Sequence, residues 1–111
     1  MTDQRKKYLY DILRSIELIE IFLSSVNNFD EYAIDPKTQS AKERHLAIIG
    51  EAVNKLDNRF PNTTLDSSRQ IVGLRNRLIH AYNSVDPSII WAIVNNHLTP
   101  LKNEVMEMIN K

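Results

Sequence analysis

Residues 41–56, AKERHLAIIGEAVNKL, decide the fold because they read as several uninterrupted turns of one helix. The apolar residues of this stretch recur every three or four positions, which places them on one helical face: Leu46, Ile49, Val53 and Leu56. Just upstream, Asp35-Pro36 supplies an N-cap residue followed by proline at the first helical position. The sequence therefore predicts a long helix that begins near residue 36 and is buried along one face.

Another long helix is predicted nearer the N-terminus, from about Asp3 to Val26, with Thr2 or Asp3 as its N-cap. Its apolar residues also lie at helical spacing: Leu9, Ile12, Leu13, Ile16, Ile19, Leu23 and Val26. A second apolar stripe widens this surface and predicts burial on more than one side: Leu18, Ile21 and Phe22. Between the two helices we expect a loop or single turn at residues 27–32 that lays Phe29 and Tyr32 on the core.

Residues 58–64 read as a connector, after which a third helix is predicted from the N-cap candidate Asp66 to Asn83-Ser84. Asp86-Pro87 begins a fourth helix in the same way as Asp35-Pro36, and Thr99-Pro100 predicts a short last helix. No alternation typical of β-strands is visible. We therefore expect an all-α protein, an antiparallel bundle of four to five helices in a single domain over residues 1–111.

The composition sets limits on the function. A chain of 111 residues with 42% hydrophobic and 25% charged residues is typical of a small globular domain, which pairing with a second copy would help to stabilise. Its formal net charge of zero argues against a broad basic surface for nucleic acid. The absence of cysteine excludes disulfides and thiolate metal sites. No apolar run approaches the roughly 20 residues that cross a bilayer, and we expect a cytoplasmic protein that does not enter the membrane.

One window of the sequence is biased toward positive charge. Between Asp66 and Asp86 there is no carboxylate, while the same window carries Arg69, Arg75, Arg77 and His80. An anionic ligand is expected near such a window. The three histidines lie far apart and no glycine-rich phosphate loop is present, so we expect neither a metal site nor a cofactor.

Arg75 and His80 together offer the chemistry for cutting RNA without a metal. Histidine takes and gives protons near neutral pH, and arginine binds phosphate oxygens through a planar cation. RNA brings its own nucleophile, the ribose 2′-hydroxyl. On a regular helix the two residues lie roughly 140° apart, so a two-fold axis that adds a second copy is the most economical way to bring both groups to one phosphate. Taken alone, however, such a pair is more often just part of a solvated helix face.

The octet at residues 75–82, RNRLIHAY, resembles the Arg-x4-His-x-Tyr signature of the HepT-like branch of the HEPN superfamily. The similarity extends to Ala41–Leu56 with its IIGEA core, to Val85-Asp86 with Trp91, and to Pro100-Leu101-Lys102, and so covers about residues 5 to 110. The resemblance implies a homodimeric, metal-independent RNase. It would be the toxin of a type VII toxin–antitoxin system, with both copies of the motif lining one cleft.

Carried over to this sequence, the resemblance makes Arg75 and His80 catalytic, Asn76 a supporting polar residue and Tyr82 a site of adenylation. It also implies a partner, a minimal nucleotidyltransferase antitoxin that would modify Tyr82. The alternative is a non-catalytic helical module that binds nucleotide, RNA or a partner protein. Trp91 could stack on RNA bases, but its apolar neighbours in sequence favour core packing.

Overall fold

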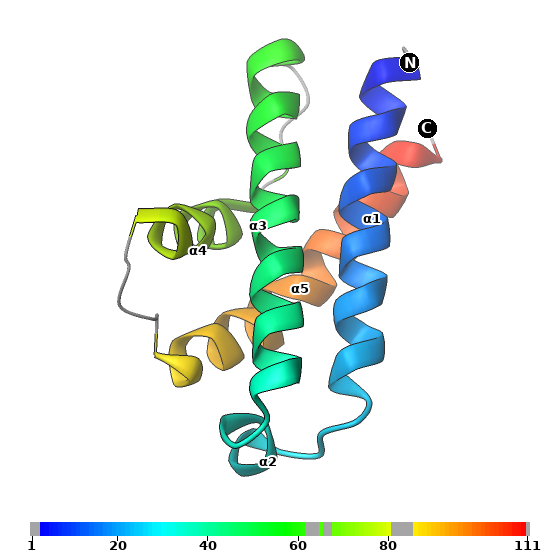
Figure 1. Ribbon diagram of the computed structural model, residues 1–111. Coiled ribbons are helices and arrows are strands. Elements are labelled where there is room, and N and C mark those ends of the chain that lie inside the picture. The colour runs from blue at the N-terminus through cyan, green and yellow to red at the C-terminus, as the bar shows by residue number, and fades with distance from the viewer. Residues whose placement is uncertain (1–2, 62–64, 66–67, 81–85, 111) are drawn as a thin grey trace.

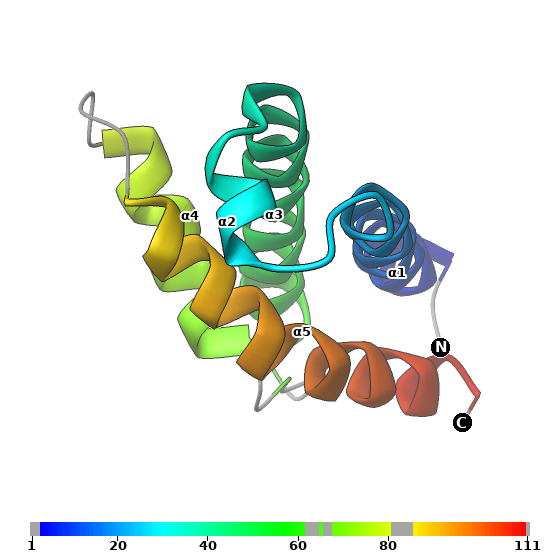
Figure 2. The same cartoon turned by 90° about the horizontal axis from the view of Figure 1, so that it is seen from below.

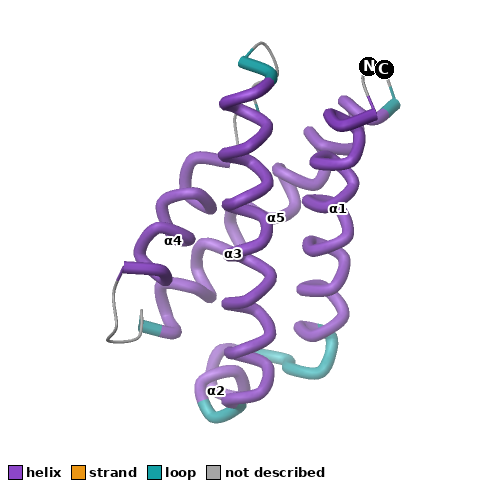
Figure 3. The backbone as a smooth tube through the Cα atoms, turned by 45° about the horizontal axis from the view of Figure 1, so that its top comes forward, coloured by secondary structure: helices purple, strands orange, loops and turns teal. Residues whose placement is uncertain are grey.

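The computed structural model describes residues 3–61, 65, 68–80 and 86–110, with the backbone alone described at residues 74, 75 and 78–80. Over this part of the chain there are five helices and no strand, which confirms the all-α prediction (Figures 1 and 3). The helices are α1 (Asp3–Leu23), α2 (Phe29–Ala33), α3 (Pro36–Arg59), α4 (Arg69–His80) and α5 (Pro87–Ile109).

The antiparallel pair α1 and α3 forms the centre of the fold, and α5 crosses both helices obliquely (Figures 1 and 2). The predicted apolar face of α3 is confirmed, because Leu46, Ile49, Val53 and Leu56 are all fully buried. The cap at Asp35 is confirmed as well, since its carboxylate accepts hydrogen bonds from the Thr38 N–H at 3.2 Å and the Thr38 hydroxyl at 2.6 Å. The start of α1 and the end of α5 lie close together (Figure 3).

The second apolar stripe of α1 does not have the predicted burial. Ile21 is 63% exposed and Phe22 36% exposed, while Leu18 is only half-buried. The prediction was wrong because helical periodicity shows that a face is apolar without showing whether a neighbour covers it. The inner face of α1 is covered by α3 and α5, and it carries the fully buried Leu9, Ile12, Ile16 and Ile19.

The last predicted helix boundary was also wrong, because α5 runs through Thr99-Pro100 without ending. A proline inside a helix cannot donate to the carbonyl four residues earlier and tends to bend the helix, and α5 does change direction part-way along its length (Figure 2). The helix continues because Leu98, Leu101 and Val105 on either side of Pro100 are all buried in the same core.

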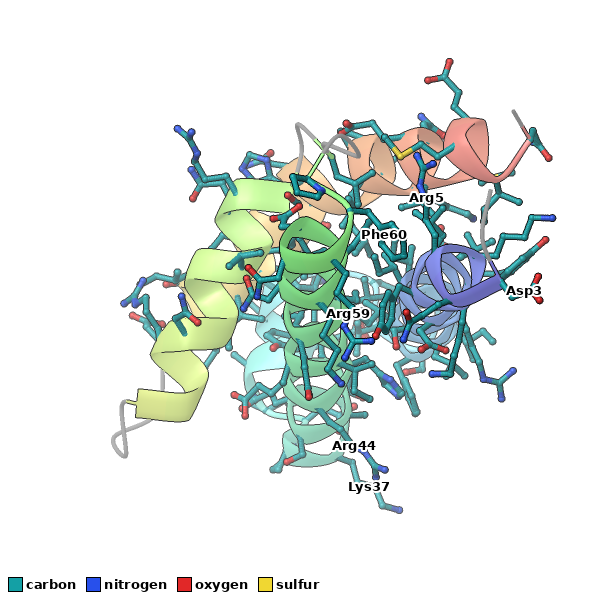
Figure 4. All side chains as sticks on the ribbon, turned by 90° about the horizontal axis from the view of Figure 1, so that it is seen from above. Asp3, Arg5, Lys37, Arg44, Arg59 and Phe60 are labelled. Carbon is teal, nitrogen blue, oxygen red and sulfur yellow. The ribbon has the colours of Figure 1, made fainter. Side chains whose placement is uncertain are left out.

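Helix α2 is the single turn expected between the first two long helices. Asn28 caps it by accepting a hydrogen bond from the Glu31 N–H at 3.0 Å. Tyr32 is fully buried and Phe29 half-buried, which confirms that both rings lie on the core. At the far end of α3, Phe60 points into the space bounded by α1, α3 and α5 (Figure 4).

Candidate active site on helix α4

Helix α4, which carries the predicted motif, packs against α3 on the side away from α1 (Figures 1 and 2). Ile71 is fully buried in the core and Val72 is half-buried. Before the helix, the Ser68 hydroxyl donates to the Leu65 carbonyl at 2.7 Å, and Leu65 itself is buried. These contacts fix the N-terminal half of α4 to the body of the protein.

The opposite side of α4 is open to solvent. Its exposed residues are Arg69, Gln70, Gly73, Asn76 and Arg77. The helix continues through Gly73, where an added Cβ would meet no atom within 4 Å. The described surface of the helix therefore carries two guanidinium groups and two amides but no carboxylate, as the sequence window predicted.

The structure places the predicted site residues only in part. Arg75 and His80 both lie on the backbone of α4, and His80 is its last residue. Residue 80 follows Asn76 by one helical turn, so the backbone puts the two positions on the same side of α4. The side chains of Arg75 and His80, and Tyr82 as a whole, lie outside the described residues. Convergence of Arg75 and His80 on one phosphate therefore stays a prediction.

The segment that carries Tyr82 lies outside the described residues, between the end of α4 and the start of α5. Residues 81–85 join α4 to α5, and α5 begins with the predicted cap and proline at Asp86 and Pro87. The Asp86 carboxylate accepts from the Ser88 N–H and from the Ser88 hydroxyl, each at 2.9 Å, and these hydrogen bonds lower the pKa of Asp86. The start of α5 is thus fixed locally, directly after the motif.

Two cationic side chains of α3 do not extend this surface. Lys37 and Arg44 extend from α3 into solvent, away from α4 (Figure 4). Among the residues that the structure describes, no group of three or more histidine and carboxylate side chains could hold a metal ion. Within the same residues, no helix is both long and apolar enough to cross a bilayer.

Sequence reasoning missed one residue of chemical interest. Lys42 is fully buried, with its ammonium over the rings of Tyr32 and Trp91. Trp91 is half-buried and packs against the rings of Tyr32 and Phe29, outside the main hydrophobic core. The signal that could have found it is its spacing, because Lys42 lies four residues before Leu46 and seven before Ile49 and so falls on the buried face of α3.

Residues 12–108 match a family described as ribonuclease HepT-like, and this range contains the whole of α4 and the octet at 75–82. The chain belongs to the HepT-like ribonuclease family. No solved structure matches it significantly.

Curated relatives agree with this HepT-like assignment over nearly the full length. A protein of Thermococcus cleftensis named "Probable ribonuclease HepT" is 38% identical over 105 residues, covering 94% of each chain. A candidate RNase of Methanocaldococcus jannaschii is 37% identical over 108 residues, covering 94% of this chain and 86% of the relative. A candidate RNase of Caldanaerobacter subterraneus subsp. tengcongensis is 32% identical over 107 residues, covering 96% of this chain and 95% of the relative.

Proposed function

We propose that this HepT-like protein is a metal-independent endoribonuclease, the toxin of a type VII toxin–antitoxin pair, with Arg75 and His80 as its catalytic residues. The observation that supports the proposal is that positions 75 to 80 of the motif lie on the backbone of α4. This helix is anchored by Ile71 on one side and presents a solvent-facing surface free of carboxylates on the other. The family match and the relatives named as ribonucleases support the RNase activity itself.

The reaction needs only groups that the motif and the RNA supply. His80 takes the proton of the ribose 2′-hydroxyl, whose oxygen then attacks the adjacent phosphorus. The bond from phosphorus to the 5′-oxygen breaks, the protonated His80 gives its proton to the leaving oxygen, and a 2′,3′-cyclic phosphate remains. Arg75 binds the phosphate oxygens and stabilises the charge that builds up on them. Asn76, exposed one turn before His80, supports the site as a hydrogen-bonding group.

A homodimer completes the site. Because Arg75 and His80 lie about 140° apart on a regular helix, a single copy of α4 does not bring both onto one phosphate without help. A two-fold axis beside α4 would supply the missing group from the second copy. We therefore place the RNA in a cleft lined by two copies of α4.

The resemblance of the motif to the HepT-like signature supports control by a minimal nucleotidyltransferase antitoxin that would act on Tyr82. Adenylation of its hydroxyl would add a phosphate and a nucleoside two residues after His80. The added negative charge repels RNA, and the added bulk fills the cleft. Mass spectrometry of Tyr82 after co-expression with a neighbouring transferase tests this step, and an unmodified tyrosine in a neutralised pair would contradict it.

A second candidate function is a non-catalytic module that holds RNA, a nucleotide or a partner protein in the same cleft. The formal net charge of zero favours it, since strong RNA binders usually depend on many cationic contacts. In that case substitutions of Arg75 or His80 would change only the binding of the ligand, and no cleavage would appear at any protein concentration.

The test of the catalytic proposal compares Arg75→Ala with Arg69→Ala, which removes an exposed arginine from the same helix. RNA with one 2′-deoxyribose at the cleavage position serves as the second arm. We expect Arg75→Ala to lose at least a hundredfold in cleavage rate, Arg69→Ala to stay within a few-fold of wild type, and the deoxy substrate to remain uncut. Equal losses in the two variants, or cleavage of the deoxy substrate, would contradict the mechanism.

A further inference from the structure

The second apolar stripe of α1 lies on an open face of the fold. Helix α5 crosses the pair α1 and α3 on one side, and no described helix lies on the other side (Figure 2). Toward this open side Ile21 is 63% exposed and Phe22 is 36% exposed. Large apolar side chains that gather on an exposed surface commonly mark a site of interaction.

A pocket opens between α1 and α3 on the same face. It has a volume of about 450 Å³ and is lined by Phe22, Asp35, Lys37, Thr38 and Ala41. Beside it the ring of Phe22 stacks on that of His45, with the two centroids 6.0 Å apart. Leu18 lies one turn before Phe22 on α1 and is only half-buried, so it continues the apolar surface away from the pocket. We call the pocket, together with Leu18, Ile21 and His45, the α1–α3 surface.

The rim of the α1–α3 surface is positively charged. Arg14 lies one turn before Leu18 on α1. Lys37 and Arg44 extend from α3 away from α5 (Figure 4). Burial, and then the charges of Arg44 and Arg14, lower the pKa of His45, so both guanidinium groups lie near this ring. The three cations are exposed, and none of them forms a salt bridge with a carboxylate of the described residues.

The carboxylates of the same helical turns face other elements. Glu20 in α1 accepts from Lys102 in α5 at 2.8 Å, and the charge of Glu17 also acts on Lys102. Glu43 of α3 lies near the buried tyrosine of α2. Asp35 does line the pocket, but its side chain already accepts hydrogen bonds as the N-cap of α3. The α1–α3 surface thus combines apolar side chains with exposed cations.

We propose that the α1–α3 surface binds an amphipathic helix of a partner protein, one that presents apolar side chains flanked by carboxylates. The apolar side chains of the partner enter the pocket beside Phe22, and its carboxylates pair with Arg14 and Arg44. Arg14 and Phe22 are eight residues apart on α1, so the surface is about 12 Å long and holds about two turns of a bound helix. The proposal does not depend on RNase activity, because α4 packs against α3 on the side away from α1 (Figure 1).

Two other occupants fit the surface less well. A second copy of this chain, placed across a two-fold axis through the surface, would set Arg14 and Arg44 against their own counterparts. Nucleic acid would pair its phosphates with the cations, but the aliphatic Ile21 offers no ring for a base to stack on, and the Asp35 carboxylate repels phosphate. An acidic amphipathic helix uses both the apolar and the cationic groups.

Fluorescence anisotropy of a labelled synthetic helix tests the proposal on the full-length protein. The probe is a peptide of about 18 residues with leucines along one side and glutamates beside them, and its counterpart carries lysines in place of the glutamates. We expect the glutamate peptide to bind at least tenfold more tightly than the lysine peptide, with an affinity that falls as salt is added. Equal affinities, or no binding of the glutamate peptide, would overturn the proposal.

Charge reversal locates the binding. The double variant Arg14→Glu with Arg44→Glu should bind the glutamate peptide at least tenfold more weakly than wild type, and Ile21→Ser should bind it several-fold more weakly. The matched control is Arg69→Glu with Arg77→Glu, which makes the same change in net charge at two exposed positions of α4 and should bind as wild type does. Circular dichroism should show every variant folded, because all five positions are exposed. Equal losses in the two double variants would overturn the proposal.

The two other occupants give distinct results. A single-stranded DNA oligonucleotide, which has no 2′-hydroxyl, should not displace the glutamate peptide, and sedimentation should give the same oligomeric state for wild type and for the Arg14 and Arg44 double variant. Displacement by the oligonucleotide would assign the surface to nucleic acid, and loss of a dimer in the double variant would assign it to a second copy. Either result would overturn the proposal, whereas a protein that cuts no RNA would contradict only the proposed function.

Discussion

Replacing Ile71 with alanine tests whether α4 sits on the protein as described. Ile71 is fully buried, and the substitution removes three carbon atoms from the core. At about 0.8 kcal/mol for each buried carbon, the lost transfer free energy is about 2.4 kcal/mol. The cavity left behind should bring the total loss in the free energy of unfolding to about 3 kcal/mol. Small domains commonly have 5–15 kcal/mol of stability, so this variant should still fold.

Val72→Ala is the matched control, because it removes two carbon atoms from the next residue, which is only half-buried. The expected loss is about 1 kcal/mol. Urea denaturation followed by circular dichroism measures both variants, with an unchanged slope showing that the unfolded state is the same. If Ile71→Ala lost no more free energy of unfolding than Val72→Ala, the described orientation of α4 about its own axis would be wrong. The assignment of Asn76 and position 80 to its outer side would then fail as well.

Three further predictions concern charged groups. Burial and nearby arginines lower the pKa of His45 below 6.5, so the folded state binds fewer protons than the unfolded state and should lose stability as the pH falls below 6.5. Arg14→Ala should raise the pKa of His45 in an NMR titration, and an unchanged pKa would contradict the role of Arg14. Lys102 in α5 donates to Glu20 in α1 at 2.8 Å. A double-mutant cycle should give a coupling energy of about 0.2–1 kcal/mol that declines with salt, and a coupling energy that does not change with salt would contradict an electrostatic contact. Lys42→Met should stabilise the protein at pH 7 by at most about 3 kcal/mol, because the lowered pKa of Lys42 makes its proton a cost to folding below pH 8; the gain should vanish toward pH 10.5, and a gain that does not depend on pH would refute the linkage.

Most of the fold could be predicted because local patterns determine it. The spacing of Leu46, Ile49, Val53 and Leu56 reports the buried face of α3 directly. Aspartate followed by proline marks the start of both α3 and α5. Thr99-Pro100 led to a wrong helix boundary because the local sequence is ambiguous there: proline fits the first turn of a helix and, at a cost, also its interior. Only the packing of α5 along its whole length distinguishes the two cases.

At the candidate site, too, the sequence predicts local features but not contacts between distant residues. The motif spacing correctly put Arg75 and His80 on one helix, because an uninterrupted helical pattern is local information. How their side chains meet depends on a second copy of the chain, which a single sequence does not describe. The contacts of Lys42 were missed because the rings of Tyr32 and Trp91 that enclose it come from distant parts of the sequence.

Single-turnover cleavage of a labelled RNA pool in the presence of EDTA, by wild type and by His80→Ala, tests the central claim most directly. His97→Ala is the control, because it removes a half-buried histidine from α5 outside the motif. A general acid or base contributes about 10²–10⁴-fold, so His80→Ala should cut at least a hundredfold more slowly than wild type and His97→Ala. Equal rates for wild type and His80→Ala would contradict the assignment of His80 and of the α4 surface as the active site.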